Sequence, residues 1–83
     1  MIEENFYKAF ANKDRIKLLL CLRQEKSVTD LLDSCSFSQS ALSQHLKILK
    51  DGGVVDTKRD GKFIFYKIKN KKFFTIAKML LDK

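Results

Sequence analysis

Hydrophobic residues recur every three or four positions through the first part of the chain, and this spacing predicts helices. A first helix is predicted over residues 2–10, where Phe6 and Phe10 lie four positions apart. Asn12 breaks the pattern, and either Asn12 or Asp14 can cap a second helix over residues 13–24, because their short side chains accept hydrogen bonds from free first-turn amides. Helical spacing gives that second helix a broad core-facing stripe, consisting of Ile16, Leu18, Leu19, Leu20, Leu22 and Arg23.

A short third helix is predicted over residues 28–34. Ser27 and Asp30 have the spacing of a capping box, in which each side chain accepts a hydrogen bond from the other residue's amide. The inward-facing residues are Val28, Leu31 and Leu32. A tight connection over residues 35–37 follows, with Phe37 as its one large apolar residue to bury.

The fourth helix carries two stripes of different chemistry. Ser38 can cap it, and Gly52-Gly53 suit a left-handed ending after Asp51. The core stripe consists of Leu42, Leu46 and Leu49, flanked by Ala41 and Ile48. The second, hereafter the polar stripe, consists of Gln39, Ser40, Ser43, Gln44 and Lys47. A solvent-facing helix surface normally includes Glu, which forms helix well and pairs with Lys, whereas Ser and Gln suit hydrogen bonds to base edges and phosphates.

A β-hairpin and a closing helix complete the predicted elements. Residues 54–59 and 62–69 are rich in β-branched and aromatic residues, and Asp60-Gly61 between them predicts a type I′ turn. The cations at the hairpin tip are Lys58, Arg59 and Lys62. The last helix is predicted over residues 71–81 and has more apolar residues than so small a core can cover, namely Phe73, Phe74, Ile76, Ala77, Leu80 and Leu81.

Length and composition indicate one globular domain over residues 1–83. A chain of 83 residues with 45% hydrophobic residues, no Pro and three Gly builds a single core. No stretch approaches the ~20 apolar residues of a membrane span, and the first residues lack the pattern of a signal peptide. We therefore expect a cytoplasmic protein with no membrane partner.

Most of the excess positive charge lies in one third of the chain. The net charge is +7, yet residues 1–42 contain six basic and six acidic residues, while residues 43–72 contain nine basic and three acidic. A folded surface normally mixes both signs, so a basic segment inside a domain indicates a polyanionic partner.

The order of these elements predicts a mainly α fold with a β-hairpin, the α-α-α-α-β-β-α winged helix-turn-helix. An α-helix fits the major groove of double-stranded DNA, and a basic hairpin reaches the adjacent backbone or minor groove. We therefore expect a transcriptional regulator that binds double-stranded DNA and has no catalytic residues and no cofactor.

The chain also resembles the ArsR/SmtB group of winged-helix bacterial repressors over nearly its whole length. The most specific segments are residues 37–49 (FSQSALSQHLKIL), the following Gly53-Val54-Val55, and residues 60–66 (DGKFIFY). The resemblance implies a homodimer that represses transcription from a palindromic operator. It implies DNA contacts through Ser38, Gln39, Ser40, Ser43, Gln44, His45 and Lys47, with Lys58, Arg59 and Lys62 expected at the DNA backbone. The implied dimer interface lies on the first and last helices, at Phe6, Phe10, Phe73, Phe74, Ile76, Ala77, Leu80 and Leu81. The alternative is that the last helix folds back on its own core.

The chain departs from the metal-sensing members of this group. Residues 27–31 lack the Cys-x-Cys element of those members, and residues 71–83 offer only Asp82 as a ligand for their second site, so no metal is expected. Cys21 and Cys35 are interpreted as two buried free thiols, because two such distant cysteines do not suggest a disulfide framework. A redox-responsive repressor that uses them is the competing hypothesis.

The polar stripe, the histidine and the hairpin aromatics each allow a second interpretation. The polar stripe could contact another protein, which would make the chain a winged-helix interaction module. His45, the only histidine, could be a catalytic base, but no nucleophile or acidic partner accompanies it. Phe63, Phe65 and Tyr66 could stack on bases, although packing of the hairpin on the core is favoured. The sequence does not indicate a small-molecule effector.

Overall fold

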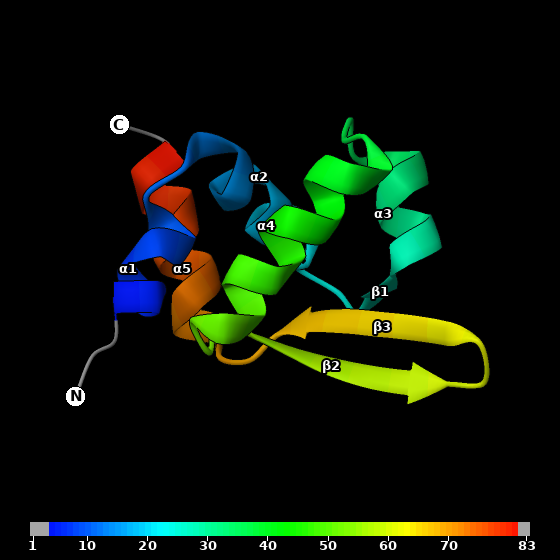
Figure 1. Ribbon diagram of the computed structural model, residues 1–83. Coiled ribbons are helices and arrows are strands. Elements are labelled where there is room, and N and C mark those ends of the chain that lie inside the picture. Colours follow the sequence, from blue (N-terminus) through cyan, green and yellow to red (C-terminus); the bar gives the residue numbers. More distant parts are fainter. Residues whose placement is uncertain (1–3, 82–83) are drawn as a thin grey trace.

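The computed structural model describes residues 4–81, which form a mainly helical fold with a small antiparallel sheet (Figure 1). In chain order the elements are α1 (Glu4–Phe10), α2 (Lys13–Cys21), β1 (Lys26–Ser27), α3 (Val28–Ser34), α4 (Gln39–Asp51), β2 (Val55–Asp60), β3 (Phe63–Ile68) and α5 (Lys71–Leu81). The four helices before the hairpin and the helix after it were all predicted, and β1 was not. The predicted start of the first helix lies outside the described residues.

The core lies where α2, α3 and α4 meet the base of the hairpin. Its buried hydrophobic residues are Ala9, Ile16, Leu18, Leu19, Leu22, Leu31, Cys35, Leu42, Leu46, Leu49, Val54, Val55 and Ala77. Most of them belong to the apolar stripes found in the sequence, because residues repeated at helical spacing share one face of a helix. The predicted core stripe of α4 is confirmed.

A side-chain cap and an arginine join α1 to α2. The Asn12 side chain accepts hydrogen bonds from the amides of Asp14 (2.8 Å) and Arg15 (3.2 Å), so Asn12 is the cap of α2 rather than Asp14. Arg15 Nε donates to the carbonyl of Lys8 at the end of α1 (2.9 Å). Partial burial lowers the pKa of the Arg15 guanidinium below its ordinary value.

The second helix ends at Cys21, three residues before the predicted end. The amide of Arg23 donates to the carbonyl of Leu20 at 3.3 Å, so the chain leaves the helix through a tighter turn. Arg23 is consequently exposed and does not join the core stripe. The helix ends early because β1 must be extended to reach the sheet.

The strand β1 pairs with β3 immediately before α3 begins. Lys26 lies opposite Tyr66 and Ser27 lies opposite Phe65, which makes a three-stranded sheet in the order β1-β3-β2. Ser27 also accepts a hydrogen bond from the Asp30 amide (3.1 Å), and the Asp30 carboxylate accepts one from the Ser27 amide (3.3 Å). The predicted capping box is confirmed. Pairing with Phe65 in the sheet also fixes the backbone of Ser27, its first residue.

The hairpin has the predicted strands with a different turn. Asp60 pairs with Phe63, so the two loop residues are Gly61 and Lys62 rather than Asp60 and Gly61. Among the described residues only Gly53 and Gly61 have positive φ, at 73° and 64°. A positive φ at the first loop position alone is typical of a type II′ turn, so the predicted type I′ turn is wrong.

Candidate nucleic-acid interface

One face of α4 is polar and exposed along the length of the helix. All five residues of the polar stripe are exposed: Gln39, Ser40, Ser43, Gln44 and Lys47. The leucines on the other face are buried and hold the helix on the core. The polar stripe is therefore presented on a rigid element rather than on a loop.

Both ends of α4 are closed by local hydrogen bonds. Ser38 Oγ accepts from the amide of Ala41 (3.2 Å), as the sequence predicts for a helix cap. At the other end the amides of Gly53 and Val54 donate to carbonyls of the last turn (3.0 and 3.1 Å), with Gly53 at positive φ. These two bonds form a Schellman motif. Ser38 thus has a structural function at the start of the polar stripe. Its exposed hydroxyl group can still donate a hydrogen bond.

The polar stripe contains one ion pair, at its far end. Lys47 Nζ lies 3.0 Å from a carboxylate oxygen of Asp51, one turn later on α4. Both side chains are largely exposed, so the pair restrains the lysine weakly and leaves its ammonium accessible. The first three turns of the stripe contain no acidic residue.

The structure separates His45 from the other predicted contacts on α4. The ring is half-buried, and its Nδ1 is buried without a hydrogen-bond partner among the described residues. It packs edge-on against Phe37, which belongs to the turn between α3 and α4. His45 therefore faces the turn, since its position on the helix lies between the core stripe and the polar stripe.

The hairpin, hereafter the wing, carries its cations on both faces and at its tip. Lys58, Arg59 and Lys62 are all exposed, as predicted. Lys58 lies opposite Phe65 and Arg59 opposite Ile64, and successive residues of a strand point to opposite faces. Lys62 is in the loop, with its ammonium 5.8 Å from the ring centroid of Phe63.

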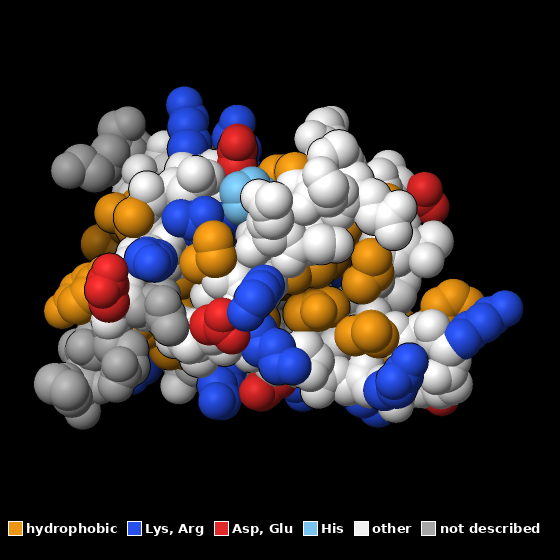
Figure 2. Space-filling view, viewed as in Figure 1, with side chains coloured by type: hydrophobic (Ala, Val, Ile, Leu, Met, Phe, Trp, Pro, Cys, Tyr) orange, Lys and Arg blue, Asp and Glu red, His pale blue; other side chains and the backbone are white. Residues whose placement is uncertain are grey.

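The basic surface extends from the wing to the start of α5. Figure 2 shows Lys and Arg side chains along the hairpin and at its projecting tip, with hydrophobic side chains between the hairpin and the uncharged surface over α3 and α4. The further exposed lysines of this region are Lys67, Lys69, Lys71 and Lys72. Among them Lys69 approaches a carboxylate, Asp56, at 3.9 Å. The wing and polar stripe together form a surface suited to a polyanion.

The two cysteines are paired, which corrects their interpretation as free thiols. Cys21, the last residue of α2, forms a disulfide with Cys35, which ends α3, and their Cα atoms are 7.1 Å apart. Their separation of 14 positions gave no sign of this, because the fold brings the ends of the two helices together. Cys35 alone is fully buried, and Cys21 is half-buried.

The predicted dimer-interface residues divide into three groups. Phe6, Phe10 and Phe73 pack on one another, with ring centroids 5.4–6.3 Å apart, and Ala77 is fully buried, so these residues hold α1 and α5 on the protomer itself. Phe74, Ile76 and Leu81 are half-buried. Leu80 is exposed (39%), as are two residues that the sequence pattern did not indicate, Tyr7 (62%) and Met79 (67%).

Neither a metal cluster nor a membrane span is found in the part of the chain that the structure describes. Over residues 4–81 no three His, Cys, Asp or Glu side chains come together, and no helix combines the length and hydrophobicity needed to cross a bilayer.

Comparison with known proteins identifies the family of this chain. The sequence profile described as "Bacterial regulatory protein, arsR family" matches residues 12–57. The chain belongs to this family. It is 36% identical to the transcriptional activator HlyU of Vibrio cholerae over 74 residues, and 34% identical to the cadmium resistance regulator CadC of Listeria innocua over 76 residues. These matches cover 88% and 89% of this chain, and 68% and 64% of the two relatives.

A third relative is matched over a smaller share of its own length. This chain is 40% identical to the HTH-type transcriptional repressor SmtB of Mycobacterium tuberculosis over 62 residues, which cover 74% of this chain and 46% of that protein. The chain therefore matches between about half and two thirds of the length of these curated relatives.

Solved structures confirm the predicted winged helix-turn-helix. HlyU from Vibrio cholerae superposes with a TM-score of 0.79 at 35% identity, covering 92% of this chain and 84% of HlyU. The repressor BigR from Xylella fastidiosa gives 0.81 at 32% identity, covering 92% and 79%. This chain is accordingly a DNA-binding transcriptional regulator of the arsR family, and it is not an enzyme.

Proposed function

We propose that the chain recognises a palindromic operator in double-stranded DNA as a homodimer and represses transcription by occupying it. The observation that carries this proposal is the exposed polar stripe beside a wing with cations on both faces. Gln39, Ser40, Ser43 and Gln44 can exchange hydrogen bonds with base edges in the major groove. Lys47 and the wing cations at positions 58, 59 and 62 neutralise phosphates.

His45 has a different role in this proposal. Its ring supports the turn that precedes α4, so it sets the angle of the polar stripe rather than contacting a base. Ser38 likewise fixes the start of α4, and its hydroxyl group can donate a hydrogen bond to a phosphate.

The proposed dimer forms through the exposed apolar residues of α1 and α5, which lie side by side in Figure 1. Tyr7, Met79 and Leu80 are exposed large apolar side chains, and exposed apolar surface on a small protein favours association. Two copies related by a two-fold axis present two α4 helices, which matches a palindromic site. Binding to the DNA of a bacterial cell also implies a cytoplasmic location.

Repression requires only the surfaces described above, because a dimer on an operator excludes other proteins from it. The relatives include a protein named as an activator and others named as repressors. Reporter transcription from a promoter that contains the selected operator should therefore fall when the chain is expressed.

Selection of bound fragments from random duplex DNA tests the proposal. We expect an enriched consensus with two-fold symmetry, and an affinity that falls by roughly 0.9 log units per log unit of salt for each phosphate neutralised. A selection without enrichment, together with a flat salt titration, would instead indicate a protein-interaction module.

A further inference from the structure

A groove with an apolar base and a charged rim lies between α2, β3 and α5. It has a volume of about 460 Å³, within the roughly 300–1,000 Å³ of pockets that hold small molecules. Its walls come from the end of α2 and the loop that follows, from the end of β3 and from the first turns of α5. None of the residues that line it is among the predicted DNA contacts, so DNA binding does not account for it.

Three apolar side chains form the base of the groove. Leu22 follows the last residue of α2 and is 1% exposed, while Ile68 of β3 and Phe74 of α5 are half-buried. Because α2 and α5 pack on each other, this base is part of the packed core. The groove therefore gives a ligand fixed apolar surface to bury.

The exposed rim contains three cations and one carboxylate. The cations are those of Arg23, Lys67 and Lys71, and the carboxylate is that of Glu25. Among the described residues, no ion pair joins any of the three cations to a carboxylate. The Thr75 hydroxyl also lies at the groove, but it donates to the carbonyl of Lys71 (3.4 Å). The cations are thus the side-chain donors that the rim offers to a ligand.

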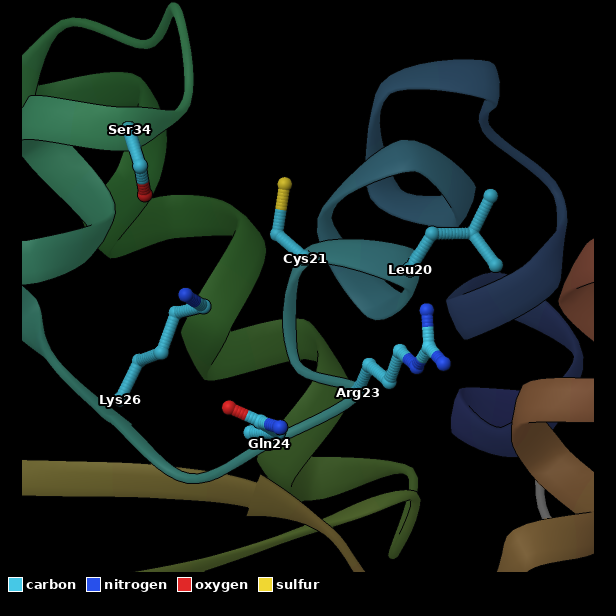
Figure 3. Close-up of a pocket in the computed structure, with 6 residues that line it drawn as sticks. All are labelled: Leu20, Cys21, Arg23, Gln24, Lys26 and Ser34. Atoms are coloured by element: carbon cyan, nitrogen blue, oxygen red, sulfur yellow. The ribbon is translucent and has the colours of Figure 1, made fainter.

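The Arg23 side chain is directed to the α5 side of its loop. Figure 3 shows the neighbouring depression, in which Arg23 extends away from Lys26 and Ser34. Arg23 lines both depressions, and in the groove it joins Lys71 and Phe74 of α5. A guanidinium in this place can pair with both oxygens of a carboxylate.

The groove lies on the side of α5 that α1 does not cover. Phe73 packs on Phe6 and Phe10 of α1. Thr75 follows Phe73 by two positions, about 200° further round a helix of 3.6 residues per turn, and lines the groove. The groove is therefore open at the surface of the protomer.

We propose that this groove binds a small carboxylate with an apolar body, such as a medium-chain alkanoate. The body lies on the apolar base, and the carboxylate accepts charge-assisted hydrogen bonds from the rim cations. A single negative charge suits the rim, because Glu25 offsets one of the three cations. The base selects against inorganic anions, which have no apolar surface to bury there. This site goes beyond the proposed function and is independent of operator binding.

Titration of the isotope-labelled chain in heteronuclear NMR tests the site, with three ligands that share one body: octanoate, octanamide and octylammonium. We expect octanoate to bind with a dissociation constant on the order of 1 mM, since so small a ligand makes few contacts. The amides that shift should be those of residues 22–25, 67–68 and 71–75. Octanamide should bind about ten-fold more weakly or worse, because it loses hydrogen bonds between charged groups. Octylammonium should not bind detectably.

Two double variants that lose the same charge provide a matched comparison. Arg23→Gln/Lys71→Gln removes two rim cations, whereas Lys72→Gln/Lys78→Gln removes two exposed lysines of α5 that do not line the groove. The first should weaken octanoate binding about five- to twenty-fold, as expected for the loss of two exposed ion pairs. The second should change it by less than about two-fold. All four side chains are exposed, so both variants should retain the circular dichroism of the parent chain.

Several results would overturn the proposal. Equal affinities for octanoate and octanamide would show that the groove is only an apolar depression. Equal losses in the two double variants, or inorganic phosphate that shifts the same amides as strongly as octanoate, would show a response to charge alone. Amide shifts confined to other parts of the chain, or no detectable binding of octanoate, would also overturn it. Operator binding by the chain without octanoate tests the proposed function separately.

Discussion

The imidazole ring of His45 lies edge-on to the phenyl ring of Phe37, with centroids 5.7 Å apart and ring planes inclined at 69°. One ring belongs to α4, and the other belongs to the turn that leads into it. The contact therefore couples the orientation of α4 to the conformation of the turn. His45, which lies in the segment that most specifically resembles the family, thus packs against the turn.

Replacing Phe37 with Ala should destabilise the chain by roughly 2–3 kcal/mol, somewhat less than for a fully buried phenylalanine, because Phe37 is half-buried. Urea denaturation followed by circular dichroism measures this change. The matched control is Phe63→Ala at the exposed wing tip, where we expect less than about 1 kcal/mol. Equal losses for the two variants would contradict a packing role for Phe37.

Two adjacent glycines at the end of α4 should respond differently to substitution by Ala. Gly53 has φ of 73°, a region that disfavours a Cβ atom, so Gly53→Ala should cost about 1 kcal/mol of unfolding free energy. Gly52 has φ of −79°, which alanine adopts freely, so Gly52→Ala should be neutral or stabilising by up to about 1 kcal/mol. Thermal unfolding of the two variants checks the difference, and the same sign for both would show that the Schellman motif does not control this position.

Two further variants should distinguish a residue that reads bases from a residue that contacts phosphates. Gln44→Ala should reduce the preference for operator over random duplex by about 1–3 kcal/mol, because an amide side chain can discriminate between bases. Arg59→Ala should weaken binding to both duplexes about equally and lower the salt slope by about 1. Competition binding at several salt concentrations distinguishes these effects, and identical profiles would refute this division.

The proposed dimer face should be sensitive to charge. Leu80→Glu places a carboxylate on an exposed apolar position of α5, and we expect it to convert the dimer to monomer in sedimentation experiments. The control is Phe63→Glu, an exposed apolar position on the wing, which should leave the oligomeric state unchanged. A dimer that persists in Leu80→Glu would exclude this face as its main interface.

The helix ends show which predictions succeeded and why. Asn12, Ser27 and Ser38 all cap the helices that they were predicted to cap, and Gly53 has the left-handed conformation expected after α4. A cap is a contact between residues two to four positions apart, so a local pattern contains the whole interaction. The turn of the wing was misplaced by one residue, because its loop depends on the register of two strands as well as on local preference.

The remaining errors involve partners that are distant in sequence. Pairing of Lys26 with Tyr66 creates β1 and ends α2 early, and no periodicity in residues 22–27 signals it. Ala77 was assigned to a dimer interface but lies in the protomer's own core, since α5 packs against α2. At both positions the residue that packs against Lys26 or Ala77 lies far away in the sequence, so a local pattern could not identify it.

By itself, then, the sequence determined the order of the helices and the hairpin and the core and polar stripes of α4, because these depend on residue spacing along one element. The family came from the resemblance of whole segments of the sequence. Tertiary structure alone decided that Cys21 meets Cys35, that His45 meets Phe37 and that Tyr7 and Met79 remain uncovered. Such contacts form only when separate elements pack, and their geometry is set by the whole core rather than by any local pattern.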